Sequence, residues 1–282
     1  MFIEVNGTKL FFDVYGSALK VEKSNVIEKP TLIVLHGGHG FIDHTLYVEF
    51  WSQFSDQAQV VFLDQRGCGR SSPDKEEHWN LKTWAEDLYQ FCQKLDIKNP
   101  IIAGVSMGGH VMCELVDKHP AFIGGLIFCN TEAQFILDDA CNALKANGAD
   151  EAAKITREFY IKPSLEGFIA YAKKCVPYYA KKAYSVEELS RCKKQPELFI
   201  HYCKNEMLQF DYSNKLGGIT CPTLLLVGEA SPFHLPIRAK EMVAQIKPEY
   251  VTLALISDAG AAVYKDKPQE SYEIVNAFLE KF

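Results

Sequence analysis

The chain has 282 residues, 48% of them hydrophobic, and a formal net charge of -6. This length and composition allow one large domain with a sizeable core, with or without an insertion. The acidic balance argues against nucleic acid as the main partner, and no apolar run reaches the roughly 18 residues that would predict a membrane span.

The N-terminal segment and the cysteines both favour a cytoplasmic protein. Residues 1–5 have neither a basic region nor a signal-like apolar core. The nine cysteines are scattered and include no C-x-x-C pair, which argues against a zinc site or a disulfide framework. We therefore expect a protein of the reducing cytoplasm that needs no metal or other cofactor.

The N-terminal region is predicted to form a hairpin followed by a loop. Residues 2–5 and 8–15 are strand-like, and Asn6-Gly7 between them is a strong turn signal. Residues 21–30 are polar, so we expect a surface loop there.

A glycine-rich loop is predicted to follow the first buried strand. The apolar run 31–35 ends in the sequence HGGHG at residues 36–40. Glycines at this place let backbone N–H groups approach a ligand closely. A phosphate-binding loop would continue with Lys-Ser or Lys-Thr, which is missing here. The sequence is closer to the HGGG type of loop that binds an oxyanion.

The next segments are expected to have structural roles. Residues 60–63 predict another buried strand, and DQRGCGRSS at 64–72 predicts a tight, hydrogen-bonded loop. Residues 79–95 carry apolar side chains at helical spacing, so we expect a helix that covers one face of the sheet.

The pattern G-x-S-x-G, formed by Gly104, Ser106 and Gly108, carries the strongest chemical signal. It follows the apolar run 101–105 and precedes a segment with helical spacing, 110–119. Strand, sharp turn and helix together are the context of a nucleophile elbow. Such a turn holds the serine at the end of the sheet, next to a helix N-terminus whose N–H groups face developing negative charge.

The second half predicts an insertion in the sheet. Between the strand at 123–128 and the strand at 223–227 the sequence is helix-like and dense in aromatic residues. The remaining elements are a helix at 237–246, a strand at 251–256 and a helix at 268–279. We therefore predict an α/β fold with a mostly parallel twisted sheet flanked by helices, a core of residues 1–130 and 215–282, and a helical cap of residues 131–214.

Four segments resemble the α/β-hydrolase superfamily: HGGHG at 36–40, DQRGCGRSS at 64–72, GVSMGG at 104–109, and the pair LLLVGE at 224–229 and ISDAG at 256–260. The resemblance covers nearly the whole chain and is nearest to the capped branch of proline-iminopeptidase-like enzymes, esterases and lactonases. It implies that Ser106 is the nucleophile and that the N–H groups of Gly38 and Met107 form the oxyanion hole. True proline iminopeptidases usually carry Trp where Met107 stands, which argues against activity on N-terminal proline.

The chain departs from the superfamily at the other two positions of the catalytic triad. Ser231 occupies the acid position and Ala261 the histidine position. Ala261 has no nitrogen that could accept a proton, and Ser231 has no charge to balance an imidazolium. A serine hydroxyl without a base is a poor nucleophile.

Three explanations fit these two substitutions. The chain is an inactivated form of a working hydrolase, a natural non-catalytic member that binds a small molecule, or an enzyme whose missing groups have moved. Candidates for moved groups are His39, His44 and His234 as bases, and Glu132 or Glu229 as acids. His36 and His110 are expected to be structural.

The function predicted from the sequence is hydrolysis of a carboxylic ester, lactone or amide through an acyl-enzyme on Ser106, in a catalytically impaired form. The partner is a small-molecule substrate, with no role for nucleic acid or membrane. We expect His39, Phe41, Tyr160 and Tyr179 to contact that substrate, because dense aromatic residues suit the roof of an apolar pocket.

Overall fold

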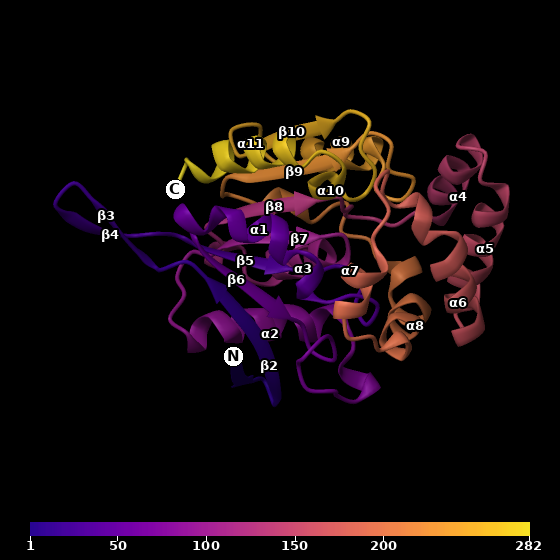
Figure 1. Ribbon diagram of the computed structural model, residues 1–282, viewed down its shortest axis with the longest axis horizontal. Coiled ribbons are helices and arrows are strands. Elements are labelled where there is room, and N and C mark those ends of the chain that lie inside the picture. The colour runs from indigo at the N-terminus through magenta and orange to yellow at the C-terminus, as the bar shows by residue number, and fades with distance from the viewer.

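An eight-stranded sheet forms the centre of the computed structural model, which describes all residues from 1 to 282 (Figure 1). The strand order is β1-β2-β6-β5-β7-β8-β9-β10. The first two strands are antiparallel to their neighbours and the other six are parallel, which confirms the predicted mostly parallel sheet. The strands span Phe2–Val5 (β1), Thr8–Tyr15 (β2), Thr31–Leu35 (β5), Gln59–Asp64 (β6), Ile101–Val105 (β7), Gly125–Cys129 (β8), Thr223–Gly228 (β9) and Val251–Ile256 (β10).

Alternate residues of the central strands pack into two apolar cores, one on each face of the sheet. In β5, Ile33 and Leu35 pack into one core, while Leu32 and Val34 pack into the other. This is the pattern of a parallel strand covered on both faces. The first core is completed by the helices α2 (Leu81–Lys94), α3 (Met107–Lys118) and α9 (Pro236–Gln245), and the second by α1 (Val48–Trp51), α10 (Val263–Asp266) and α11 (Pro268–Leu279).

Five helices and no strand lie between β8 and β9, as predicted for an inserted cap. They are α4 (Leu137–Ala146), α5 (Asp150–Ile161), α6 (Leu165–Lys174), α7 (Val186–Arg191) and α8 (Pro196–Asn205). Figure 1 shows this group at the end of the sheet toward which the parallel strands point. Ligands of open α/β sheets bind at that end. The limits 131–214 for the cap remain our proposal.

The prediction of a surface loop at residues 21–30 was wrong. The strands β3 (Leu19–Glu22) and β4 (Asn25–Glu28) form a separate antiparallel hairpin, with Val21 opposite Val26, and Figure 1 shows it projecting from the rest of the molecule. The turn was missed because it lacks glycine: Lys23 itself adopts the left-handed conformation, with φ of 56°. Both faces of the hairpin are largely exposed, and β4 lacks the polar–apolar alternation of a half-buried strand, although β3, with the sequence LKVE, has it.

The other hairpin signal was read correctly. Asn6 and Gly7 both have positive φ, 46° and 72°, as the turn between β1 and β2 requires. None of the helices has the length and apolar character needed to cross a membrane.

Candidate active site

Ser106 forms a sharp turn between β7 and α3. Its φ and ψ are 50° and −119°, a conformation that residues with a Cβ rarely adopt. The flanking glycines make the turn possible. A Cβ on Gly104 would lie 2.7 Å from the carbonyl carbon of Gly108, and a Cβ on Gly108 would lie 2.5 Å from the carbonyl oxygen of Leu35. The elbow predicted from G-x-S-x-G is therefore present, with the serine side chain partly exposed at its tip.

The glycine-rich loop after β5 passes directly beside this turn. A Cβ on Gly37 would lie 2.9 Å from the Cβ of Ser106, so no larger residue fits there without a shift. Gly38, the next residue, has a φ of 54°. The backbone N–H groups of Gly38 and Met107 have no acceptor within the protein. Gly38 and Met107 line the same cavity as Ser106, so two amides without an acceptor border that space.

Ser106 lines a cavity of about 100 Å³ beneath the cap. Of the 22 residues that line it, 19 are hydrophobic, and the other three are Gly38, Ser106 and His234. Phe41, Tyr160 and Tyr179 are among the apolar ones, as is Met107, so the structure brings these predicted residues together around Ser106.

His39, expected to contact the substrate, does not line this cavity. Its side chain is fully buried next to Trp84, with ring centroids 4.6 Å apart, and its Nε2 lies 2.9 Å from Oε1 of Gln65. The sequence placed His39 in the correct loop, but the turn at Gly38 and Gly40, both at positive φ, directs its ring inward.

Residues 30–268 match the family model for the alpha/beta hydrolase fold. The chain belongs to the alpha/beta hydrolase fold family. Among curated proteins it is similar to the proline iminopeptidase of Lactobacillus crispatus, with 25% identity over 90% of this chain and 91% of the relative. Two solved structures share the fold over 97% or more of both chains: a proline iminopeptidase from Mycobacterium smegmatis (TM-score 0.79, 18% identity) and an enol-lactonase from Burkholderia xenovorans LB400 (TM-score 0.76, 21% identity). These relationships support an enzyme of the hydrolase class.

Ser231 and Ala261, which were predicted to stand at the acid and histidine positions of a triad, differ in their surroundings. Ser231 is buried away from the cavity, and its hydroxyl accepts the backbone N–H groups of Phe233 (3.4 Å) and His234 (3.1 Å). It therefore stabilises a turn. Ala261 lines the cavity, and its N–H donates to the carbonyl oxygen of Tyr179 in the cap. The Ala261 side chain has no atom that could accept a proton.

A buried chain of polar groups lies beside the cavity. His234 Nδ1 contacts one carboxylate oxygen of Glu132, and His110 Nε2 lies 3.4 Å from the other. The far nitrogen of His110, Nδ1, lies 2.9 Å from the hydroxyl of Tyr202. Burial by itself would raise the pKa of Glu132, but the charges and hydrogen bonds of His234 and His110 outweigh it and hold that pKa at about 2. Glu132 is therefore a carboxylate at any ordinary pH.

Sequence reasoning named His234 and Glu132 as separate candidates but did not pair them. The two residues are 102 positions apart. The available signal was topological, because Glu132 follows β8 and His234 follows β9, and these strands are neighbours in the sheet. The other candidates for moved groups lie elsewhere: His44 contacts Asp64, and Glu229 is exposed and bonded to Ser257.

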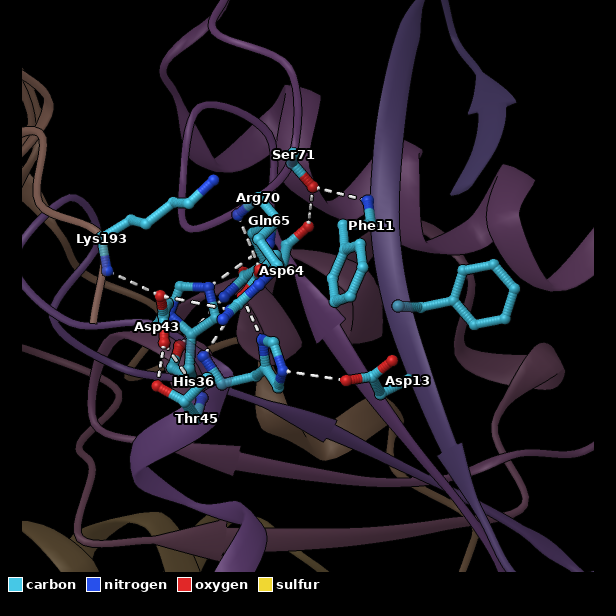
Figure 2. Close-up of polar contacts among 12 residues, drawn as sticks. Phe11, Asp13, His36, Asp43, Thr45, Asp64, Gln65, Arg70, Ser71 and Lys193 are labelled. Atoms are coloured by element: carbon cyan, nitrogen blue, oxygen red, sulfur yellow. Dashed lines mark hydrogen bonds and ion pairs between the residues drawn. The ribbon is translucent and has the colours of Figure 1, made fainter. Parts of the chain in front are cut away.

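The loop at 64–72 is tightly hydrogen-bonded, as expected, and Figure 2 shows the polar contacts around it. Asp64 accepts from His44 Nδ1 (2.7 Å) and from the N–H of Arg70 (2.8 Å). Asp43 accepts the N–H of Lys193, 2.8 Å away, which ties the cap to the loop that carries Gly38.

Asp43, His44 and Asp64 have ligand-type atoms within 4.8 Å of one another, the kind of group that can hold a metal ion. Each of these atoms already has a hydrogen-bond partner, and a guanidinium nitrogen of Arg70 lies 3.8 Å from Asp43. The donor set thus fits a structural network better than a cation site.

Proposed function

We propose that this chain hydrolyses a carboxylic ester, lactone or amide through an acyl-enzyme on Ser106. The observation that carries the proposal is the strained Ser106 turn, which directs a hydroxyl toward an apolar cavity beside two unpartnered amides. Backbone strain of this kind persists where a function requires it.

The chemistry follows from these groups. The Ser106 oxygen would attack the carbonyl carbon, and the N–H groups of Gly38 and Met107 would stabilise the oxygen as it becomes negative. One such donor is worth roughly 3–4 kcal/mol of barrier. The carbon–oxygen or carbon–nitrogen bond to the leaving group then breaks, the leaving group takes up a proton, and water hydrolyses the serine ester.

The cavity favours an uncharged apolar substrate. Its tyrosine hydroxyls bond mainly to one another, Tyr184 to Tyr264 at 2.9 Å and Tyr160 to Tyr171 at 3.3 Å, so aromatic faces line the space. No carboxylate lines it that could bind the ammonium group of an N-terminal proline. This favours an ester or lactone with an apolar acyl group over a prolyl peptide.

The substitutions at Ser231 and Ala261 remove the usual acid and base. If nothing replaced them, activity would be slow but not zero. In a serine protease without its triad, binding and the oxyanion hole still give about 10³–10⁴-fold over water. The impaired form predicted from the sequence corresponds to this case.

The test is covalent labelling. Treatment with a fluorophosphonate should add one phosphonyl group, located on Ser106 by mass spectrometry and absent in Ser106→Ala. Ester hydrolysis would be measured with p-nitrophenyl acetate in the unaltered chain, Ser231→Asp, Ala261→His and the double variant. No adduct and no turnover in any of the four would refute the hydrolase and favour a ligand-binding protein.

A further inference from the structure

We propose, building on the function proposed above, that His234 oriented by Glu132 is the general base and acid for Ser106. The pair would replace the acid and histidine that are absent at positions 231 and 261.

His234 has the hydrogen-bonding state that a base requires. Its Nδ1 contacts the Glu132 carboxylate, which can only accept, so the Nδ1 proton is held there and the lone pair lies on Nε2. That Nε2 is buried, since only 4% of the residue is exposed, and it has no hydrogen-bond partner. Leaving a buried polar atom unpaired costs free energy, so such an atom at a cavity calls for an explanation.

No other histidine meets these conditions. His234 is the only histidine that lines the cavity of Ser106. His110 Nδ1 lies within hydrogen-bond distance of the Tyr202 hydroxyl, and its Nε2 makes no hydrogen bond but lies 3.4 Å from Glu132, outside the cavity lining. The unpartnered Nδ1 of His39 is also buried outside that lining. His36 and His44 are engaged at both nitrogens.

The sheet brings the three groups to one place. Ser106, Glu132 and His234 follow β7, β8 and β9, which are adjacent parallel strands, so all three lie at the same edge. Thr131, next to Glu132, donates its hydroxyl to the carbonyl oxygen of Ser106 at 2.8 Å. The segment carrying the carboxylate is thereby fixed directly against the elbow.

The proposed step moves one proton and one electron pair at a time. As the Ser106 oxygen forms its bond to the carbonyl carbon, its proton passes to Nε2 of His234, and Glu132 stabilises the imidazolium. The imidazolium then protonates the leaving group as the bond to it breaks. Ser106 and His234 are not hydrogen-bonded in the free protein, so the bound substrate must draw them together or one water must bridge them.

The experiment compares kcat/KM for p-nitrophenyl butyrate in the unaltered chain, Ser106→Ala, His234→Gln, Glu132→Gln and the double variant Ser106→Ala/His234→Gln. We expect His234→Gln to lower kcat/KM by about 10²–10⁴-fold. The double variant should be no slower than Ser106→Ala, because the groups act as a unit. His44→Gln is the matched control, since it removes another buried histidine–carboxylate pair outside the cavity, and it should leave the activity unchanged.

Chemical rescue separates catalysis from folding. Added imidazole should restore part of the activity of His234→Ala and none of that of Ser106→Ala. A structural histidine would not respond in this way. Activity of His234→Gln within about threefold of the unaltered chain, or no rescue in a His234→Ala protein with native circular dichroism, would overturn the assignment.

The outcomes also separate this assignment from the hydrolase proposal. If the unaltered chain is inactive but Ser231→Asp/Ala261→His hydrolyses ester through Ser106, His234 is not the base and the hydrolase proposal stands. If that variant is inactive as well and no Ser106 adduct forms, the hydrolase proposal itself fails.

Discussion

Replacing Ser106 by glycine should stabilise the protein while abolishing its proposed chemistry. At φ 50° and ψ −119°, a residue with a Cβ costs about 1–3 kcal/mol, and glycine removes that cost. Ser106→Ala keeps the Cβ and therefore the strain. The serine side chain makes no capping hydrogen bond to α3, so neither substitution loses one.

Ser164 is the control that distinguishes backbone strain at Ser106 from the ordinary preference for glycine over alanine at the start of a helix. Ser164 begins α6 with an unstrained φ of −152°, and its side chain accepts the N–H of Gly167. Both Ser164→Ala and Ser164→Gly lose that bond, so their difference measures the general preference. At each position we take the free energy of unfolding of the glycine variant minus that of the alanine variant. This difference should be larger at Ser106 than at Ser164 by about 1–2 kcal/mol, which is somewhat less than the full strain because the turn relaxes partly.

Urea denaturation followed by circular dichroism gives the four free energies of unfolding, and equal slopes would show that the unfolded states are comparable. In thermal scans this additional stabilisation at Ser106 corresponds to a rise in Tm of roughly 2–4 °C. An excess of zero or of opposite sign would refute the idea that the elbow stores strain.

Two further predictions concern stability. Burial lowers the pKa of His36, His39 and His110, so these histidines stabilise the fold fully above their unfolded pKa of about 6.5, and this stabilisation is lost as the pH falls below it. The raised pKa of His44 acts in the opposite sense. Because three histidines oppose one, we expect a net loss of stability between pH 7.5 and 5.5 in urea denaturation, and unchanged stability would contradict this. Arg66→Met should cost about 3–5 kcal/mol, because it leaves Asp87 buried without the guanidinium whose Nε and Nη2 lie 2.7 and 2.6 Å from its oxygens. Adding Asp87→Leu should recover at least half of that loss, and a double variant no more stable than Arg66→Met would argue against it.

The local features of this protein were readable from its sequence because short-range sterics specify them. Asn6-Gly7 adopts the two left-handed conformations that its hairpin needs, and Gly104 and Gly108 leave the space that the Ser106 turn requires. The run 31–35 is buried on both sides and became a strand of the same bounds. The turn at Lys23 could not be predicted in this way, because a turn without glycine carries no comparable sequence signal.

The identity of the groups around Ser106 depended on the tertiary structure. His39 and His234 both lie in loops at the carboxyl ends of strands, yet one ring is buried against Trp84 and Gln65 while the other borders the cavity. The pairing of Glu132 with His234 joins residues on either side of the five cap helices. Side-chain direction and the pairing of residues far apart in the chain depend on how the strands and loops pack against one another. A single sequence carries local preferences but does not state which distant segments come into contact.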